Sequence, residues 1–341
     1  MQRPYGLLRV GFPYVKTIGT FGTTHPPADL AFGREGRIYV ICHIFSKVIR
    51  IINSDDDDLG WFGVQAREFP LADGEFYWPV QIIVDSDERV YVSDQASHRI
   101  SVFSHEGEFL GKWGEHGHRD GQIDRPSGIV FDPEENVLVV DTLNHRVQKF
   151  TKGGDFISNW GVHGEGEGEM KMPWGIAADG EGFVYVSDWR NDRIQKFTSD
   201  GEYVFAFGNS GIGKGEFRGP AGIDVDGHGD IYVADRGNSR IQVFDPDGNY
   251  VQQFQGDSTL SKSALKRMFT RDKKYHRIRS SADVESLKFF KRPRSVAVDD
   301  QFRMFVPDYE HYRIQIYQKE AYTLSEEEIA PPLRSPTTQL G

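Results

Sequence analysis

The sequence contains one cysteine, Cys42, among its 341 residues. A single thiol excludes a disulfide framework and a cysteine-rich zinc site, and it fits a reducing compartment. The chain also lacks a run of about 18 apolar residues that could span a membrane. Residues 1–12 lack the apolar stretch of a secretory signal. We therefore expect a soluble, cytoplasmic protein without membrane insertion, and the sequence leaves its oligomeric state open.

Helical periodicity is also scarce, because short strand-like segments that repeat occupy most of the chain. Five of them share an apolar run, an aspartate, a polar turn and an arginine: YVSDQASHRISVF from Tyr91, LVVDTLNHRVQKF from Leu138, YVSDWRNDRIQKF from Tyr185, IYVADRGNSRIQVF from Ile231 and MFVPDYEHYRIQIY from Met304. A sixth segment, from Ile38, keeps the shape but has lost most of the signature residues. With the turns around them, these units predict four short strands each. Four strands in about 40 to 50 residues are typical of one blade of a β-propeller.

A proline opens each unit, at Pro27, Pro79, Pro126, Pro173, Pro220 and Pro293. The intervals of 52, 47, 47, 47 and 73 residues predict an all-β, six-bladed propeller with a short helical insertion before the last blade. Residues 14–22 look like a fourth strand without the three that should precede it. We expect this strand to complete the last blade and close the ring, which leaves no open sheet edge. Residues 321–324 compete for the same place.

These patterns divide the chain into three parts. We expect an N-terminal extension over residues 1–13, a propeller over residues 14–319 and a tail over residues 320–341. The propeller includes the closing strand and the insertion at residues 257–291. The tail is acidic and rich in proline, so it has little apolar surface to bury and we expect it to be disordered.

The repeated units resemble NHL repeats, the modules of six-bladed propellers in animal ubiquitin ligases and translational repressors and in many free-standing bacterial proteins. The resemblance covers Tyr14 to about Tyr317 and includes the phrases GEFYWP, GQIDRP, GEMKMP and GEFRGP ahead of four blades. It implies a scaffold of the free-standing bacterial type. It implies no reaction, because function belongs to sites placed on a fold.

An aspartate and an arginine recur at fixed distances from the prolines. They follow by 15 and 20 residues, as Asp94, Asp141, Asp188, Asp235 and Asp308 and as Arg99, Arg146, Arg193, Arg240 and Arg313. A catalytic group is needed once, whereas a group present in five blades is architecture. We expect the carboxylate to accept hydrogen bonds from turn amides and the arginine to bridge neighbouring blades.

Function should therefore lie where the repeats differ, on the face that collects the loops before the first strands and after the turn aspartates. Two residues after the proline, three blades have glycine, whereas the others have Ser295, Asp29 and Gln81. Because these three blades are adjacent in a closed ring, we predict a ligand site at the channel mouth. The alternative is hydrogen bonding to channel water. The loops after the aspartates add further recognition candidates: His43, Trp189, Arg190, Arg236, Tyr309 and His311.

Histidines raise the question of a metal. His116, His118 and His163 lie in loops expected on this face, where three imidazoles could bind a divalent cation. The six-bladed amidating lyases, distant relatives of NHL proteins, resemble this picture, but their metal histidines directly follow the proline of a blade. That slot here holds Ala28, Val80, Ser127, Trp174, Ala221 and Arg294.

The four consecutive aspartates at residues 55–58 could attract calcium, although their spacing favours a solvated turn.

The insertion carries concentrated positive charge. Residues 262–294 contain twelve basic and three acidic residues, so this segment carries +9 and the rest of the chain −20 within the total of −11. Apolar residues at helical spacing predict one helix capped by Ser258 or Thr259 and a second over residues 281–287. The basic segment could lie on the acidic propeller as a lid, reach for a partner, or be a structural excursion.

These observations favour a binding or scaffold protein that recognises a protein or a small ligand with one face of the propeller. The alternative is a metal-assisted lyase or hydrolase at the channel mouth, similar to the amidating lyases or lactonases, with zinc or calcium as the metal. Otherwise we expect no cofactor. Binding of single-stranded RNA is a third hypothesis, because loop aromatics can stack on bases, but the acidic body disfavours nucleic acid.

Overall fold

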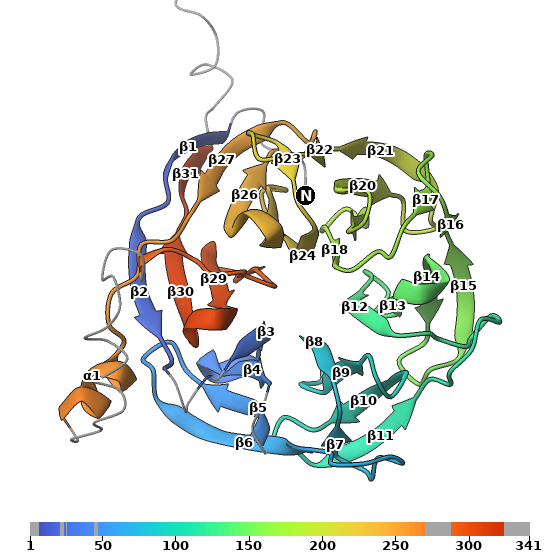
Figure 1. The fold of residues 1–341 in the computed structure, drawn as a ribbon, viewed down its shortest axis with the longest axis horizontal. Coiled ribbons are helices and arrows are strands. Elements are labelled where there is room, and N and C mark those ends of the chain that lie inside the picture. Colours follow the sequence, from blue (N-terminus) through green and yellow to red (C-terminus); the bar gives the residue numbers. More distant parts are fainter. Residues whose placement is uncertain (1–6, 21–23, 25, 44–46, 270–287, 324–341) are drawn as a thin grey trace, which may run out of the picture.

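The computed structural model describes residues 7–20, 24, 26–43, 47–269 and 288–323. Six sheets, each built on four antiparallel strands, surround a central axis like the blades of a propeller (Figure 1). This arrangement confirms the all-β, six-bladed architecture predicted from the repeats.

The first three blades run outward from the axis in chain order. Their strands are β3 (Pro27–Phe32), β4 (Ile38–Cys42), β5 (Lys47–Ile52) and β6 (Asp58–Gln65); β8 (Pro79–Val84), β9 (Val90–Asp94), β10 (Arg99–Phe103) and β11 (Phe109–Trp113); and β12 (Pro126–Phe131), β13 (Val137–Asp141), β14 (Arg146–Phe150) and β15 (Phe156–Trp160). The second strands are buried along their whole length because blades pack against both of their faces. The fourth strands are partly exposed, and β11 alternates between half-buried and exposed residues.

The remaining blades repeat this plan. Their strands are β18 (Ile176–Ala178), β19 (Val184–Asp188), β20 (Arg193–Phe197) and β21 (Tyr203–Phe207); β24 (Pro220–Val225), β25 (Ile231–Asp235), β26 (Arg240–Phe244) and β27 (Tyr250–Phe254); and β28 (Ala297–Val298), β29 (Arg303–Asp308), β30 (Arg313–Gln318) and β2 (Tyr14–Ile18). In the last blade the outermost strand comes from the other end of the chain. Strand β2 lies antiparallel to β30, with Ile18 opposite Ile314, and so closes the ring.

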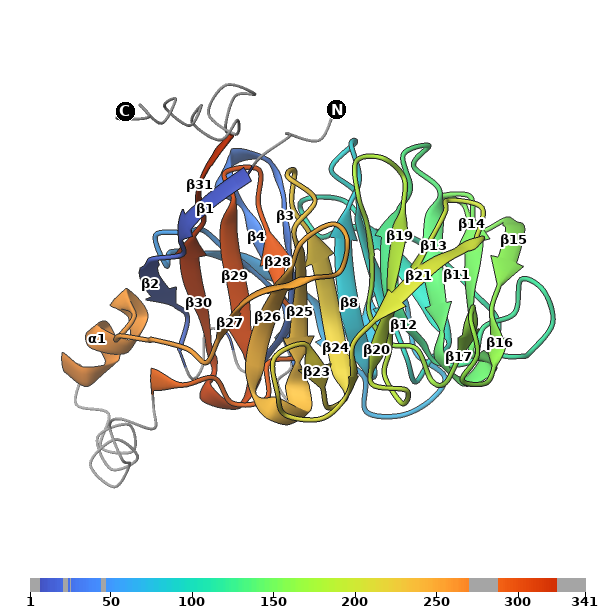
Figure 2. The ribbon, with the colours of Figure 1, turned by 90° about the horizontal axis from the view of Figure 1, so that it is seen from above.

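Both ends of the described chain meet in a separate two-stranded ribbon. Strand β1 (Leu7–Gly11) pairs antiparallel with β31 (Glu320–Thr323). Residues 321–323, the competing candidate for the closing place, therefore pair outside the blades. The first residues of the expected tail form a strand rather than disordered chain, and the rest of that tail lies outside the described residues. The ribbon lies toward the face opposite β17 (Glu169–Met170) and β23 (Glu216–Phe217) (Figure 2).

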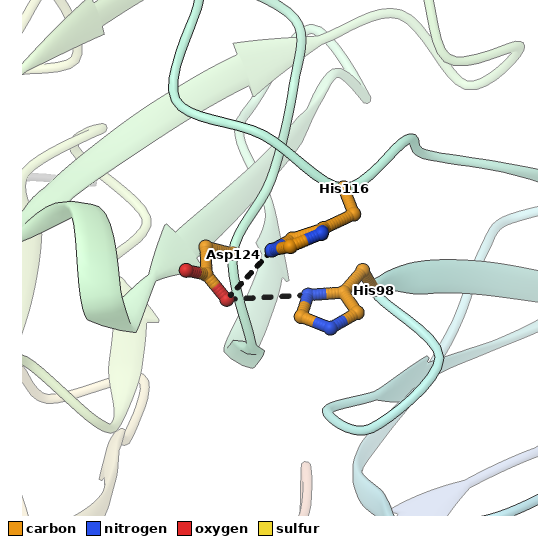
Figure 3. A group of neighbouring side chains, drawn as sticks. All are labelled: His98, His116 and Asp124. Carbon is orange, nitrogen blue, oxygen red and sulfur yellow. Dashed lines mark ion pairs between the residues drawn. The ribbon is translucent and has the colours of Figure 1, made fainter.

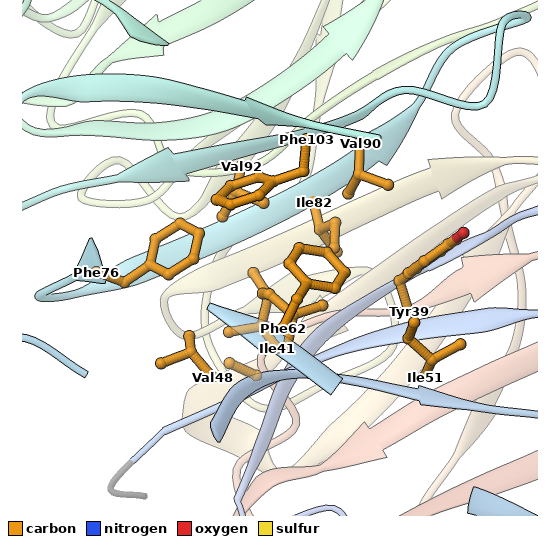
Figure 4. Packing of buried hydrophobic residues seen from close by; sticks show 12 residues of the cluster. Tyr39, Ile41, Val48, Ile51, Phe62, Phe76, Ile82, Val90, Val92 and Phe103 are labelled. Carbon is orange, nitrogen blue, oxygen red and sulfur yellow. The ribbon is translucent and has the colours of Figure 1, made fainter. Parts of the chain in front are cut away.

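The linkers between blades each insert an apolar residue into the junction. Three residues before the prolines of blades 2 to 6 stand Phe76, Ile123, Met170, Phe217 and Phe290, all of which are buried. At the junction of blades 1 and 2, the ring centroids of Phe76, on β7 (Glu75–Phe76), and Phe103 lie 5.5 Å apart. Both belong to a cluster of side chains from the two blades (Figure 4). Two later linkers contain short parallel strand pairs. These are β16 (Val162–His163) with β17, and β22 (Asn209–Ser210) with β23. The recurring linker phrases thus seal the blades to one another.

Single turns of 3-10 helix complete the repeat. They are η1 (Arg34–Gly36), η2 (Thr142–Asn144), η3 (Arg236–Asn238) and η5 (Tyr309–His311). The last three follow the turn aspartates of blades 3, 5 and 6, where the predicted recognition loops lie.

The insertion forms helix α1 (Lys262–Phe269), which lies outside the ring beside β2 (Figure 1). Its cap is Ser261 rather than Ser258 or Thr259, because the Ala264 amide donates to Ser261 Oγ at 3.0 Å. The helix does not cover the central axis, and the second predicted helix falls outside the described residues. In the described part of the chain, no helix has the length and apolar character needed to cross a bilayer.

The run of aspartates at residues 55–58 receives this insertion. Asp56 accepts hydrogen bonds from the Ser263 amide at 2.6 Å and from the Gly19 amide at 2.7 Å, and Lys262 lies 2.6 Å from Asp57. Asp55, Asp57 and Asp58 are exposed, as expected for a solvated turn, whereas the expectation missed the contacts of Asp56 with the insertion. The acidic turn of blade 1 joins the insertion to the end of the closing strand.

Candidate functional site

The recurrent aspartates and arginines hold the turns and linkers, as predicted. Asp141 is fully buried, and it accepts the Asp124 amide at 2.6 Å and the Arg146 Nε–H at 2.9 Å. Arg146 also donates to the carbonyl oxygens of Arg119 and Gln122 in the linker from the preceding blade. Burial raises the pKa of Asp141, and the donated hydrogen bonds oppose that shift. Because blades 4 and 5 repeat these contacts, the pairs are structural.

The three polar residues two positions after the proline lie on the innermost strands or at their entry. The Ser295 hydroxyl donates to the Asp29 carboxylate, and Asp29 accepts the Ile82 amide of the next blade at 2.9 Å. Gln81 accepts the Ile129 amide at 3.0 Å. The structure therefore brings Ser295 and Asp29 together, and the oxygens of Asp29 and Gln81 join adjacent blades.

A second carboxyl on an innermost strand escaped the prediction. Asp224, on β24, accepts the Val298 amide of the next blade at 2.7 Å. Burial raises its pKa to about 7, and the like charges of Asp226 and Asp29 add to that shift. Burial likewise raises the pKa of Asp29 to about 6. The position of Asp224 is apolar in the other five blades, as Ala31, Ile83, Val130, Ala177 and Ala297. This single aspartate at an otherwise apolar position was the sequence feature that could have identified Asp224.

A pocket of about 430 Å³ opens on the face that collects the linkers and the loops after the turn aspartates. It is lined by residues from blades 2 to 6: Tyr77, Trp78, Gln95, Ala96, Arg125, Trp174, Trp189, Ala221, Arg236 and Arg294. Of the predicted recognition residues, Trp189 and Arg236 are in this lining. Trp174, Ala221 and Arg294 directly follow the proline of a blade, the position that holds the metal histidines in amidating lyases.

Arginines give this pocket its charge. Its lining contains three guanidinium groups and, among the described residues, no carboxylate. Arg294 stacks on the Tyr309 ring, 3.8 Å from the centroid. The buried Nε atoms of Arg236 and Arg294 have no hydrogen-bond partner in the described part of the chain. Burial lowers the pKa of both groups, yet a guanidinium stays charged at neutral pH.

His43 lies behind the pocket wall rather than in it. Its Nε2–H donates to the Pro79 carbonyl at 2.6 Å, so Nδ1 accepts the Tyr309 hydroxyl at 3.2 Å. Burial lowers its pKa to about 4 and keeps the imidazole neutral. The ring also packs 4.9 Å from that of Trp78. His43 thus positions two pocket residues, Trp78 directly and Arg294 through Tyr309.

The other predicted recognition residues also lie outside the pocket lining, namely Tyr309, Arg190 and His311. Arg190 is exposed and stacks on Trp189, 4.4 Å from the ring centroid. His311 Nδ1 lies 3.0 Å from the Asp308 carboxylate and 3.1 Å from the Phe289 carbonyl. These contacts make His311 part of the turn, whereas Arg190 lies on the surface beside the pocket residue Trp189.

The three histidines proposed as metal ligands are not brought together. His116 instead stacks on His98, with ring centroids 4.0 Å apart, beside Asp124 (Figure 3). His163 lies one junction further on, 4.5 Å from His145, and His118 is exposed. The expected grouping of the three histidines is therefore wrong, because His163 lies at a different blade junction and His116 is grouped with His98 and Asp124 instead.

Comparisons with known proteins agree with the repeat geometry. The NHL repeat model matches residues 124–150, 170–197 and 217–244, which end with the third strands of blades 3 to 5. The chain contains NHL repeats. No curated protein matches it in sequence. Three blades therefore match the NHL repeat model, and the strand pairing shows the six-bladed ring.

Solved structures share the fold at low sequence identity. A catalytically inactive virginiamycin B lyase from Staphylococcus aureus, solved with quinupristin, is 14% identical, with a TM-score of 0.56 over 93% of this chain and 90% of the lyase. A gluconolactonase from Xanthomonas campestris is 13% identical, with a TM-score of 0.59 over 92% of this chain and 100% of that enzyme. A Bacteroides thetaiotaomicron protein of unknown function is 16% identical, with a TM-score of 0.61 over 92% of this chain and 76% of the other. At these identities the likeness describes the fold.

Proposed function

We propose that this NHL propeller is a binding protein whose pocket takes a small organic anion with a planar ring. The observation that carries the proposal is the lining itself, where Tyr77, Trp78, Trp174 and Trp189 stand beside three arginines. Aromatic walls bind flat apolar groups, and guanidinium donors bind carboxylate or phosphate. A volume of about 430 Å³ is within the range of small-molecule sites.

A matched pair of ligands tests this function. We expect isothermal titration calorimetry to detect 2-naphthoate and to find the neutral 2-naphthamide at least about tenfold weaker, since a hydrogen bond to a charged group contributes roughly 1.5–3 kcal/mol. Arg236→Met and Arg294→Met should each weaken the carboxylate by a similar factor and leave the amide unchanged. Arg89→Met, which removes an arginine outside the pocket lining, is the control. Equal affinity for acid and amide would refute the proposal.

A hydrolase or lyase is the second candidate, and the carboxyls of Asp29 and Asp224 favour it. Both have a pKa near neutrality, the range in which a carboxyl exchanges protons efficiently. The fold neighbours include a lyase and a lactonase. Loss of a measured lactonase or lyase activity in Asp224→Asn would support this function.

Binding of single-stranded RNA stays a prediction, which a salt-dependent shift assay tests.

A further inference from the structure

The junction of blades 2 and 3 gathers three metal-ligating side chains outside the pocket lining. They are His98 from the turn after β9, His116 from the loop after β11, and Asp124 from the linker into β12 (Figure 3). Asp124 Oδ1 lies 3.3 Å from His98 Nδ1 and 3.6 Å from His116 Nε2. One ligand atom from each residue lies within 4.8 Å of the others.

These separations match the edges of a tetrahedral coordination sphere. Zinc binds imidazole nitrogen and carboxylate oxygen at about 2.0–2.2 Å, so two tetrahedral ligands stand roughly 3.3–3.5 Å apart. Calcium and magnesium prefer all-oxygen ligands, which excludes them from a site with two imidazoles. The donor set and the two separations from Asp124 therefore fit zinc.

The hydrogen bonds of His98 place a lone pair of its ring beside the Asp124 carboxylate. The Arg125 amide donates to His98 Nδ1 at 3.1 Å, so this nitrogen carries a lone pair in the neutral ring. Asp124 Oδ1 then faces a second acceptor at 3.3 Å, which is electrostatically unfavourable unless a proton or a metal ion lies between them. Nitrogen atoms of two histidines therefore face the same carboxylate oxygen.

The next junction provides an internal comparison. His145 Nδ1 likewise accepts the Met172 amide, and His145 packs against His163. At the position of Asp124, however, that junction has Lys171, whose amide donates to the turn aspartate as the Asp124 amide does. The pair of histidines therefore recurs, whereas of these two junctions only the one between blades 2 and 3 has the carboxylate.

We propose that His98, His116 and Asp124 form a zinc site with three protein ligands. His98 would bind through Nδ1, His116 through Nε2 and Asp124 through Oδ1, which leaves the fourth position to water. Zinc takes the lone pair that now accepts the Arg125 amide, so binding displaces that hydrogen bond. The site is accessible, because the His116 side chain is 64% exposed and that of Asp124 is 26% exposed.

Zinc titration of the untagged full chain tests the site. After removal of metal with a chelator, we expect calorimetry and elemental analysis to give one tightly bound zinc ion per chain. Cobalt in its place should show the visible absorption of tetrahedral coordination. His116→Ala and Asp124→Asn should each weaken zinc binding at least about tenfold. Both side chains are partly exposed, and thermal melting without metal verifies that each variant folds.

The neighbouring junction supplies matched controls. His163→Ala removes an exposed histidine from a pair that lacks the carboxylate, and it should leave zinc affinity unchanged. Lys171→Asp should build a second site and raise the stoichiometry to two. The proposal is overturned if the wild-type chain binds no zinc, if Asp124→Asn binds as the wild type does, or if His163→Ala weakens binding as much as His116→Ala. A stoichiometry that stays at one in Lys171→Asp counts against it as well.

Discussion

Single residues on the innermost strands make the stability of this propeller depend on pH. The pKa of Asp29 is about 6 and that of Asp224 about 7, whereas both are near 3.8 in the unfolded chain. Between these values the folded state binds more protons than the unfolded state, so the free energy of unfolding falls as the pH rises. The dependence covers the range from about pH 4 to pH 7.

Replacing Asp224 with asparagine should remove part of that dependence. We expect urea unfolding to show that the wild-type chain loses more stability between pH 4.5 and pH 8 than Asp224→Asn does, because the amide has no charge to desolvate. Asp200→Asn, at an exposed turn, should behave as the wild type. Parallel pH profiles for wild type and Asp224→Asn would contradict this account.

The sequence predicted residues well where their role repeats and poorly where a site joins several blades. Asp141 and Arg146 were assigned to architecture because five copies cannot share one catalytic task, and their contacts confirm it. Arg294 was missed, because its slot was searched for histidine rather than for charge. The partnership of His98 with Asp124 was missed because the two residues are far apart in sequence and meet through blade packing.

Among the elements, the linkers contribute more to stability than their two-residue strands suggest. Phe217 on β23 is fully buried between blades 4 and 5 and packs 5.5 Å from Phe244. We expect Phe217→Ala to lower the free energy of unfolding by about 3–5 kcal/mol, since it leaves a cavity at a junction. In the same linker, Ile212 is 70% exposed, and Ile212→Ala should change stability by less than about 0.5 kcal/mol. Chemical denaturation compares the two, and similar losses would show that the junction tolerates the cavity.

The helical insertion shows what periodicity predicts and what it misses. Apolar spacing correctly indicated a helix, but its cap is Ser261, because the acidic turn at Asp56 holds the Ser263 amide. That partner lies on blade 1, about 200 residues away, and local sequence contains no trace of it. The choice of cap was thus made by tertiary contact rather than by propensity.

On the scale of the whole molecule, β2 is the element on which the ring depends. A chain without residues 1–18 would expose the edge of β30, and exposed edges pair with other chains. We expect this truncated protein to self-associate in sedimentation velocity and to melt at a lower temperature. A synthetic peptide of residues 7–20 should restore the association state of the full chain, and a scrambled peptide should not. A truncated chain that associates no more than the full chain and is equally stable would show that the last blade needs three strands only.

Closure by β2 also sets an order of events during synthesis. The closing strand β2 leaves the ribosome before the other strands of the six blades, and its partner β30 follows about 300 residues later, roughly 15–60 s at ordinary rates of translation. Until then five blades can form while β2 has no partner strand. The ring therefore closes only after β30 has been made, and a ribosome stalled before β30 would hold an open propeller.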